Sequence, residues 1–364
     1  MKKNNIIKKI TVFLFLFSIF IVPTIMITTE DKDVNEIENK ILQKFPRFNY
    51  ENIKSGRFMS QFDTYTSDQF PLRNMFLYAK NGLNYALGQR EFRNIYVTSS
   101  GKLLEKYTEN KDVLSANIEF INNSVKDIDV KSTLFLVPNS ISIYKDELPK
   151  YFLTDNQEDS YKFISEKLDM NLYSPLNVLK KHKNEYIYFN TDHHWTQLGA
   201  KIAFEDFFNQ KINSDYTLLS DNFFGTYYSK AMLNNINADK IYCYKDLGQF
   251  ENVLDGLHSN SLYNSSKLES KNKYQYFLNG DPAEGIIHGD GKGSILIIKD
   301  SFAHNFLPFL AKIYKTIHII DPRYSNTSIT NYIKTNKDIN EVLFLLSLST
   351  INSDYLQRRW YLNR

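Results

Sequence analysis

Cysteine is almost missing from the sequence, since Cys243 is the only one among 364 residues. This absence excludes a disulfide framework and a cysteine-based zinc site. A strong charge of either sign is missing as well, because 44 Lys and Arg residues stand against 41 Asp and Glu residues. Nucleic-acid-binding proteins carry a clear basic surplus. We therefore expect no nucleic-acid partner.

Internal repeats, Gly/Ser linkers and long charge runs are also missing, which argues against a repeat array or a string of flexible domains. Hydrophobic residues make up 42% of the chain and aromatic residues 15%. This is enough for a core in one large or two ordinary domains, and it excludes general disorder. The 25 Tyr and 27 Phe residues could stack on sugar rings, but the matching abundance of Ile, Lys and Asn indicates a codon bias instead.

One long apolar run stands near the N-terminus, from Ile10 to Ile27, and it reaches the lower end of the length that crosses a bilayer. Four lysines precede the run and three acidic residues follow it. By the positive-inside rule the lysines stay in the cytoplasm, and the chain from about Thr28 onward is exported. The pattern predicts a single-pass anchor at residues 1–28 in the cell membrane and an extracellular domain. A cleavable signal peptide is the alternative, although no small-x-small cleavage site follows the run.

The segment after the run, Thr29 to Asn52, is polar with sparse apolar residues and predicts a short helix that ends before Pro46. We place a membrane-proximal helical segment at residues 29–90. The main domain is expected at residues 91–364, with an insertion around residues 210–293.

Short apolar runs in the exported part predict buried strands. They are Thr133–Val137, Tyr186–Phe189, Ser294–Ile298, Ile317–Ile320 and Val342–Leu346. Helical patterns follow two of them, at Gln197–Asn209 and at Ala303–Tyr314, and Pro308 should kink or shorten the second. The alternation of strand and helix predicts a parallel sheet in an α/β domain.

Polar residues follow the predicted strands, and open α/β sheets bind ligands outside the carboxyl ends of their strands. These residues are Pro138, Asn139 and Ser140, then Thr191, Asp192, His193, His194 and Trp195, then Asp300 and Ser301, and last Asp321, Pro322, Arg323 and Tyr324. A serine hydroxyl becomes nucleophilic beside an imidazole that a carboxylate orients. We therefore assign Ser301 as candidate nucleophile, His194 as candidate base and Asp192 as the residue that orients the base.

Each assignment has an alternative. Asp300 and Ser301 stand where a helix N-cap belongs, so capping alone would explain the serine. Asp192 and the two histidines after it could instead bind a metal ion, although no further ligands stand at a recognisable spacing. Arg323 could form a local salt bridge with Asp321. The remaining histidines favour structural roles: His182, His258, His288, His304 and His318.

Two segments carry a resemblance to a known family. Tyr186–Ala200 (YIYFNTDHHWTQLGA) together with Ile297–Tyr324, which contains DSFA, resembles the DHHW protein family of Gram-positive bacteria. Ser67–Phe76, Val137–Pro149 and Asn222–Lys230 add to the resemblance, which covers most of the exported chain. That family is similar to alginate O-acetylation proteins, which have a circularly permuted SGNH-hydrolase-like domain.

The resemblance implies an α/β fold with a three-layer, circularly permuted SGNH-like parallel sheet, after the N-terminal transmembrane helix. The family's Asp-x-His pattern falls on Asp192 and His194 and its serine on Ser301, in the reverse of the chain order of ordinary SGNH hydrolases. Oxyanion or substrate-binding candidates are Arg323, Asn139, Tyr324, His193 and Trp195. Asp321 and Arg323 would lie at the superfamily's second block, and Ser347, Ser349 and Asn352 near its third.

Two departures from the superfamily pattern concern the oxyanion hole. Lys299 replaces the glycine that precedes Asp-Ser, which restricts how closely the backbone approaches an acyl group but leaves the Ser301 amide as a donor. No Gly-x-Asn-Asp sequence is present, so Asn139 and Asn352 are the candidates for the asparagine donor.

The resemblance implies O-acetyl transfer to a polysaccharide outside the cell, without a cofactor or a metal. Because acetyl-CoA is absent there, the acetyl group would come through a multi-pass membrane O-acyltransferase. An SGNH-type esterase that removes acetyl groups is the first alternative, because the same triad can transfer the acetyl group to water. A catalytically silent glycan-binding scaffold is the second.

Overall fold

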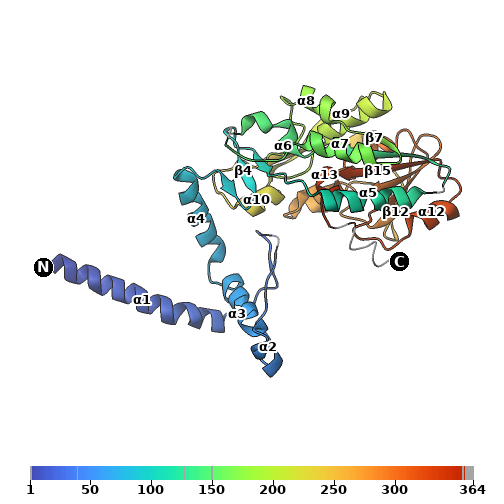
Figure 1. The fold of residues 1–364 in the computed structure, drawn as a ribbon. Helices are drawn as coiled ribbons and strands as arrows, with labels where there is room; N and C mark the ends of the chain where they lie inside the picture. Colours follow the sequence, from blue (N-terminus) through green and yellow to red (C-terminus); the bar gives the residue numbers. More distant parts are fainter. Residues whose placement is uncertain (1, 39, 127, 149–150, 355, 357–364) are drawn as a thin grey trace. The chain divides into compact units, whose positions relative to one another are not determined.

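The computed structural model describes residues 2–38, 40–126, 128–148, 151–354 and 356. The chain divides into two compact units (Figure 1): a smaller one of Met1–Phe92 and Ser229–Asn235, and a larger one of Arg93–Tyr228 and Ile236–Arg364. The domain limits expected from the sequence stay a prediction.

The smaller unit is mostly helical. Its elements are α1 (Lys2–Thr28), β1 (Val34–Asn35), β2 (Lys40–Ile41), α2 (Tyr50–Lys54), α3 (Arg57–Asp68), α4 (Arg73–Ala86) and β3 (Glu91–Phe92). Within α1, Ile6–Thr28 is long and apolar enough to cross a membrane, and its apolar side chains are largely exposed. This helix stands where the sequence predicts the anchor.

The helix predicted within residues 29–46 is wrong, because β1 and β2 pair there as a short antiparallel ladder. The Asn35 side chain accepts hydrogen bonds from the backbone N–H groups of Ile37 and Glu38 at 3.1 and 3.2 Å. These bonds give the two N–H groups a non-helical partner and favour a turn.

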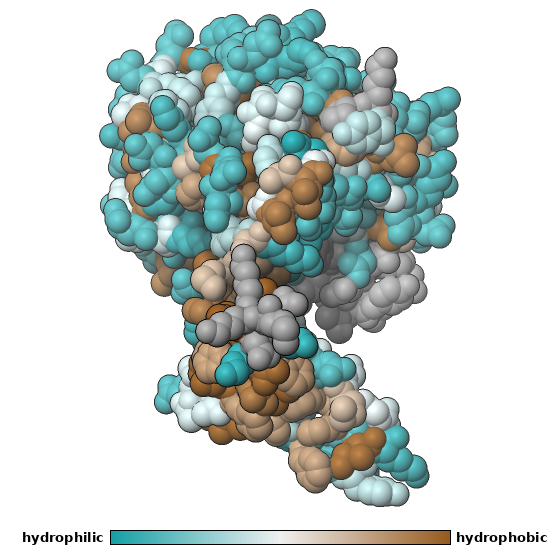
Figure 2. Space-filling model, turned by 90° about the vertical axis from the view of Figure 1, so that its left-hand side faces the viewer, coloured by the Kyte–Doolittle hydropathy of each residue, from teal (hydrophilic) through white to brown (hydrophobic). Residues whose placement is uncertain are grey.

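Among the described residues between 29 and 90, helical structure is confined to α2, α3 and α4. Large apolar side chains are exposed on or beside these helices, among them Phe48, Tyr50, Met59, Leu72, Met75, Phe76 and Leu83. Figure 2 shows apolar residues in brown in the lower part of the view. Contiguous apolar surface marks contacts with proteins or membranes.

The larger unit holds the remaining elements. They are β4 (Ile95–Val97), β5 (Leu103–Glu105), α5 (Lys111–Val125), β6 (Lys131–Val137), α6 (Ser140–Ile143), η1 (Lys145–Glu147), α7 (Gln157–Lys167), β7 (Asn171–Tyr173), α8 (Leu176–Lys181), α9 (Gln197–Phe208), β8 (Tyr216–Phe223), β9 (Asp239–Tyr244), η2 (Lys245–Leu247), β10 (Asn252–Leu254), β11 (Leu257–Ser259), η3 (Ser265–Glu269), η4 (Lys273–Tyr276), β12 (Glu284–His288), β13 (Ser294–Lys299), η5 (Ser301–Ala303), α11 (Leu307–Leu310), β14 (Thr316–Ile320), α12 (Ile329–Thr335), β15 (Glu341–Ser347) and α13 (Leu348–Ile351). One further helix, α10 (Thr226–Ala231), begins in this unit.

An eight-stranded sheet forms the centre of the larger unit, in the order β11-β10-β12-β14-β13-β15-β6-β7. The strands from β14 to β7 are parallel, whereas β12, β10 and β11 extend the other edge as antiparallel strands. The fold is therefore mixed α/β with a parallel-rich sheet. The prediction of a parallel sheet is correct for β6, β13, β14 and β15, whose apolar runs are buried, and wrong for the antiparallel edge.

The strand predicted at residues 186–189 is wrong, because this segment turns back on itself. The N–H of Phe189 donates to the carbonyl oxygen of His194 at 3.2 Å, and the N–H of Thr196 donates to that of Ile187 at 2.9 Å. These bonds occupy backbone groups that a sheet strand would offer to its neighbour. β7 pairs with β6 at this edge instead.

Helix α9 confirms the helix predicted after this turn. The Thr196 hydroxyl caps its first turn by accepting the N–H of Gly199 at 3.3 Å. A Cβ on Gly199 would lie 2.3 Å from the carbonyl oxygen of Ile187, so only glycine lets the helix pack this closely on the turn. The residues between the turn and the helix are thereby held in place.

The helix predicted at Ala303–Tyr314 is broken into the 3-10 turn η5 and the single turn α11. Pro308 lies in the first turn of α11, where a missing N–H is harmless. It prevents one continuous helix from Ala303, because its ring would clash with the carbonyl of the fourth residue before it. The predicted shortening is confirmed.

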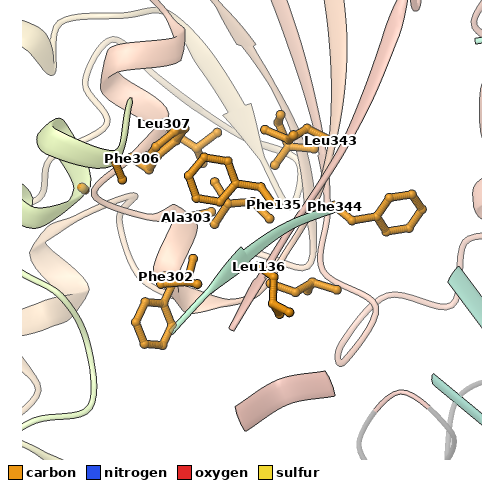
Figure 3. Packing of buried hydrophobic residues seen from close by; sticks show 14 of the residues in the cluster. Phe135, Leu136, Phe302, Ala303, Phe306, Leu307, Leu343 and Phe344 are labelled. Carbon is orange, nitrogen blue, oxygen red and sulfur yellow. The ribbon is translucent and has the colours of Figure 1, made fainter. Parts of the chain in front are cut away.

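The segment after β13 packs on the parallel strands through apolar side chains. Figure 3 shows Phe302, Ala303, Phe306 and Leu307 together with Phe135 and Leu136 of β6 and Leu343 and Phe344 of β15. The rings of Phe306 and Phe135 meet edge to face, with 5.3 Å between their centroids. Core packing therefore fixes the residues that directly follow Ser301.

Candidate active site

Three parallel strands end at one edge of the sheet, and candidate residues follow each of them. Lys299 at the end of β13 lies opposite Leu345 of β15, and Ser347 at the end of β15 lies opposite Val137 of β6. The residues that follow these strands share the edge at which open α/β sheets bind ligands.

At this edge the structure brings together the three residues singled out from the sequence. Nε2 of His194 lies 2.8 Å from Oγ of Ser301, and Nδ1 of His194 lies 2.6 Å from Oδ1 of Asp192. All three residues are buried, with Ser301 the most accessible at 9% exposure. A hydroxyl, an imidazole and a carboxylate in this order can generate a serine nucleophile.

Asp300, not Ser301, caps the turn after β13. Its Oδ1 accepts the N–H of Phe302 at 2.9 Å, and its Oδ2 accepts the N–H of Ser347 and the hydroxyl of Thr350, both at 2.7 Å. Asp300 therefore ties the ends of β13 and β15 together. The capping role, which was the alternative interpretation for Ser301, is performed by Asp300. The Ser301 hydroxyl points to His194.

Three N–H groups converge on the Asp192 carboxylate. Oδ1 accepts the backbone N–H of His194 at 3.0 Å as well as the contact from its Nδ1, and Oδ2 accepts the N–H of Thr226 at 2.8 Å. Burial alone would raise the pKa of Asp192, but the charges of His193 and His194 and these hydrogen bonds hold the pKa well below its ordinary value. Asp192 is thus ionised at neutral pH, as an orienting carboxylate must be.

A second buried carboxylate, Asp239 in β9, holds the loop that carries Asp192. It accepts hydrogen bonds from the Tyr186 hydroxyl at 2.6 Å, from the Asn190 N–H at 2.8 Å, and from the N–H and hydroxyl of Thr191 at 2.7 and 2.5 Å. Burial raises the pKa of Asp239 even though these four bonds oppose the shift. The loop is therefore anchored by a residue far along the chain.

Geometry argues against the metal-site alternative. Possible ligand atoms of Asp192, His193 and His194 lie within 4.8 Å of one another. Both ring nitrogens of His194 and both oxygens of Asp192 already have hydrogen-bond partners. A cation would have to displace Ser301 or Thr226 from them.

Trp195, a substrate-binding candidate from the sequence, lies in the core. It is fully buried, and its Nε1–H donates to the carbonyl oxygen of Phe302 at 2.9 Å. Its indole stacks on Phe306, with 5.9 Å between ring centroids. Trp195 therefore joins the histidine segment to the serine segment and is closed to a ligand.

Arg323 forms the local salt bridge that the sequence left as an alternative. Two of its nitrogens lie 2.9 and 2.7 Å from the carboxylate of Asp321. Tyr324, half exposed, has the Arg323 guanidinium 5.1 Å from its ring centroid. Lys299 joins the ion pair, because its buried Nζ lies 3.0 Å from Asp321 and 3.2 Å from Nε2 of His304. Lys299 is thus part of a buried ionic network.

The two asparagine candidates differ. Asn139 is buried after β6, and its Oδ1 has no hydrogen-bond partner within the described residues. Asn352 is committed elsewhere, because its side chain accepts the N–H of Asn110 at 2.9 Å and donates to the carbonyl oxygen of Thr108 at 2.7 Å. The side chain of Asn352 therefore serves a structural contact with the segment before α5. The two serines near the end of β15 that the resemblance singled out also differ. Ser347 caps α13, and Ser349 is exposed.

Sequence reasoning missed four residues that shape the site: Gly225, Thr226, Asp239 and Tyr274. Gly225 and Thr226 belong to the segment NFFGTYYSK, which carried part of the family resemblance, so this segment was the available signal. Tyr274 and Asp239 lie in the expected insertion, where no motif marks them.

His193, a candidate from the sequence, stands beside His194, with 3.8 Å between ring centroids, and is partly exposed.

Gly225 allows the backbone to reach Asp192. A Cβ on Gly225 would lie 2.2 Å from Cβ of Asp192 and 2.3 Å from its Oδ2. Gly225→Ala should therefore push Asp192 away and destabilise the fold by about 1–3 kcal/mol. The change is measured by urea unfolding, with Gly82→Ala as control, because nothing lies within 4 Å of a Cβ there. Equal stability of both variants would contradict the close approach.

The chain is similar to one protein family and to several solved structures. The family model described as DHHW protein matches residues 88–320. A DHHW family protein from Eubacterium siraeum has a TM-score of 0.61 at 21% identity, and the match covers 74% of this chain and 96% of that chain. Bacillus cereus PatB1 has a TM-score of 0.60 at 23% identity, with coverage of 72% and 98%. A second PatB1 structure, with a sulfonyl adduct, matches at 22% identity, with coverage of 72% and 97% and the same TM-score of 0.60.

The O-acetyltransferase domain of Pseudomonas putida AlgJ matches at 11% identity with a TM-score of 0.45, over 71% of this chain and 92% of that chain. This likeness is too distant for an argument about activity. No curated protein matches the chain. The family model spans more than half of the 364 residues and includes the histidine segment and most of the serine segment on which the resemblance rests. The chain belongs to the DHHW protein family.

Proposed function

We propose that this protein is a serine-dependent O-acetyltransferase that acetylates a polysaccharide outside the cell membrane. The observation that carries the proposal is the contact of 2.8 Å between Oγ of Ser301 and Nε2 of His194, whose Nδ1 lies 2.6 Å from Asp192. All three residues are buried, and Ser301, the most accessible of them, is the group that an acyl donor can reach.

The reaction has two halves. In the first, Oγ of Ser301 attacks the carbonyl carbon of an acetyl ester while Nε2 of His194 takes the hydroxyl proton. The imidazolium gives this proton to the departing oxygen of the donor, which leaves acetyl-Ser301. In the second half a sugar hydroxyl attacks the acetyl carbon, its proton passes to His194, and His194 returns it to Oγ of Ser301. Asp192 holds Nδ1 throughout, so that Nε2 faces the reacting oxygens.

The backbone N–H of Ser301 is the first oxyanion donor in this proposal. Within the described residues the Ser301 N–H donates no hydrogen bond, because the Asp300 carboxylate that caps this turn accepts the N–H of Phe302 instead. The Ser301 N–H can therefore donate to an oxyanion. Asn139, which follows β6 at the same edge, is the second candidate. Lys299 does not obstruct the donor, because its side chain is held in the ion pair with Asp321.

The finer fold assignment is part of the same proposal: a three-layer, circularly permuted SGNH-like domain. It is supported by the position of Ser301 two residues after the end of the central parallel strand β13. It is also supported by chain order, because Asp192 and His194 precede Ser301, whereas ordinary SGNH hydrolases begin with the serine strand.

The anchor gives the proposal its location. Helix α1 would cross the cell membrane once, with the lysines inside and the larger unit outside. Acetyl-CoA is not present outside the cell, so a multi-pass membrane O-acyltransferase would supply the acetyl group. A protein tethered to the same membrane would meet that partner readily.

The test uses the full chain in detergent or vesicles. It is incubated with an activated acetyl ester, with and without an oligosaccharide acceptor, and protein and sugar are examined by mass spectrometry. We expect one acetyl group on Ser301 and, with the acceptor, an ester on the sugar. A sulfonyl fluoride should react at Ser301 and block both products, as the sulfonyl adduct of PatB1 suggests.

The outcomes separate the three functions. Acetyl-Ser301 that passes only to water identifies an esterase and rejects the transferase. A chain that forms no acetyl-Ser301 and does not react with the sulfonyl fluoride is a silent scaffold, which rejects both enzymes.

A further inference from the structure

Tyr274 in η4 contacts both the candidate base and the backbone of the candidate nucleophile. Its ring lies parallel to the His194 imidazole, with 3.7 Å between centroids and 8° between planes. Its hydroxyl donates to the carbonyl oxygen of Ser301 at 2.9 Å. Tyr274 is 3% exposed. One buried side chain from the insertion thus links the two halves of the site.

The His194 ring is covered on both faces. The His193 ring lies 3.8 Å from it, centroid to centroid, and two rings this close cannot share one face, so His193 and Tyr274 lie on opposite faces. The edge is approached by Phe302, at 5.1 Å between centroids. His194 therefore cannot rotate away from Ser301 unless these rings move.

Proton transfer changes the charge between these rings. In the proposed reaction His194 becomes an imidazolium each time it takes a proton from Ser301 or from a sugar hydroxyl. The face of a tyrosine ring carries negative partial charge and attracts a cation, more strongly where water is excluded. Burial raises the pKa of Tyr274 well above its ordinary value, so the ring stays a neutral phenol.

Few ionisable groups compete with this contact. Apart from the apolar Phe302, the groups that contact His194 among the described residues are Asp192, His193, Ser301 and Tyr274, and His304 lies beyond the Tyr274 ring. Burial, with the charge of Lys299, lowers the pKa of His304 well below its ordinary value, so His304 stays neutral. The stabilising partners of an imidazolium at position 194 are therefore the Asp192 carboxylate and the Tyr274 ring.

We propose that Tyr274 is a positioning residue of the O-acetyl transfer: its ring stabilises the protonated form of His194, and its hydroxyl fixes the Ser301 backbone. The inference rests on the proposed function, because only a reaction that protonates His194 uses the ring in this way. A purely structural role would need the shape of the ring but not its charge distribution.

The experiment separates shape from charge at position 274. Phenylalanine and pentafluorophenylalanine are introduced there in the full chain. They have similar shape, but fluorine withdraws the negative charge from the ring face. Tyr276→Phe is the matched control, because Tyr276 lies in the same turn, is 4% exposed and contacts Cys243 and Tyr263 rather than the triad.

We expect Tyr274→Phe to keep the pH profile of kcat and to unfold at lower temperature, because the Ser301 carbonyl loses a donor. The fluorinated ring should lower kcat roughly 2- to 30-fold relative to phenylalanine, with KM little changed. It should also move the acid limb of the profile to lower pH by roughly 0.5–1 unit. Tyr276→Phe should do neither. Equal profiles with both rings would overturn the proposal.

A second readout does not depend on turnover. In the Ser301→Ala background, the imidazole titration of His194 is followed by NMR with phenylalanine or pentafluorophenylalanine at position 274. A titration at lower pH by roughly 0.5–1 unit with the fluorinated ring supports the contact, and an unchanged titration rejects it. Failure of the proposed function itself would be recognised by a different result: ester turnover would then not depend on Ser301.

Discussion

Ser301→Ala is expected to lower turnover of an activated acetyl ester by about 10⁴- to 10⁶-fold, to the level left by binding and oxyanion contacts. The reason is geometric: the Ser301 hydroxyl lies 2.8 Å from Nε2 of His194 and is the group placed to form a covalent intermediate. The fold should survive, because the cap of this turn is made by Asp300 and the carbonyl of Ser301 keeps its bond from Tyr274.

The control is Ser165→Ala, which removes an exposed hydroxyl from α7 that bonds only the carbonyl oxygen of Lys162. Turnover and melting temperature are measured for both variants. A Ser301→Ala protein that is folded and loses less than about tenfold would show that another group attacks the ester. A protein that loses activity only because it unfolds would differ from the control in melting temperature.

The parts of the site that follow from local sequence were predictable. Asp192 and His194 are two residues apart in a turn, so one carboxylate can meet both the backbone N–H and the ring of the same histidine. Ser301 stands two residues after a buried apolar strand, and the carboxyl ends of parallel strands gather at one edge. Neither argument needs to know how distant loops fold.

The parts that depend on distant contacts were not predictable. Tyr274 resembles the many other aromatic residues of the chain until the insertion folds its ring onto His194. Asp239 resembles a surface carboxylate, yet it is 1% exposed and fixes the loop before Asp192. No periodicity marks either residue, because each acts through contacts with residues that are distant in the sequence.

Misread local patterns have a common cause. Tyr186–Phe189 is as short and apolar as the true strands, but its backbone bonds are made within its own turn. The antiparallel strands β10 and β12 went unnoticed because their sequences, NVL and EGIIH, are short and mixed. Trp195 stands in the motif like a functional residue, although tertiary packing buries it. Apolar runs report burial, and burial alone does not distinguish a strand from a packed turn.

Asp192→Asn is expected to lower turnover by about 10⁴-fold while the protein stays folded. The carboxylate accepts hydrogen bonds on both oxygens, from His194 on one side and from the N–H of Thr226 on the other. An asparagine amide has one oxygen and one NH2 group. If its oxygen keeps Thr226, the NH2 faces Nδ1 of His194 and forces the proton onto Nε2, which then cannot accept a proton from Ser301.

The same substitution predicts a pH-dependent loss of stability. The pKa of Asp192 is held well below its ordinary value in the fold, so the ionised carboxylate stabilises the wild type fully above the unfolded pKa of about 3.9. As pH falls below this value, the unfolded chain takes up a proton that the fold refuses, and the advantage shrinks by up to about 1.4 kcal/mol per pH unit. Urea unfolding of wild type and Asp192→Asn should therefore differ most near neutral pH and converge in acid.

Asp221→Asn, at an exposed carboxylate of β8, is the control and should show no such convergence. An Asp192→Asn protein with full turnover would remove the orienting role of the carboxylate. A stability difference that is constant from neutral pH to acid would mean that Asp192 acts through shape alone. The two measurements together separate what the Asp192 charge does for the histidine from what its hydrogen bonds do for the fold.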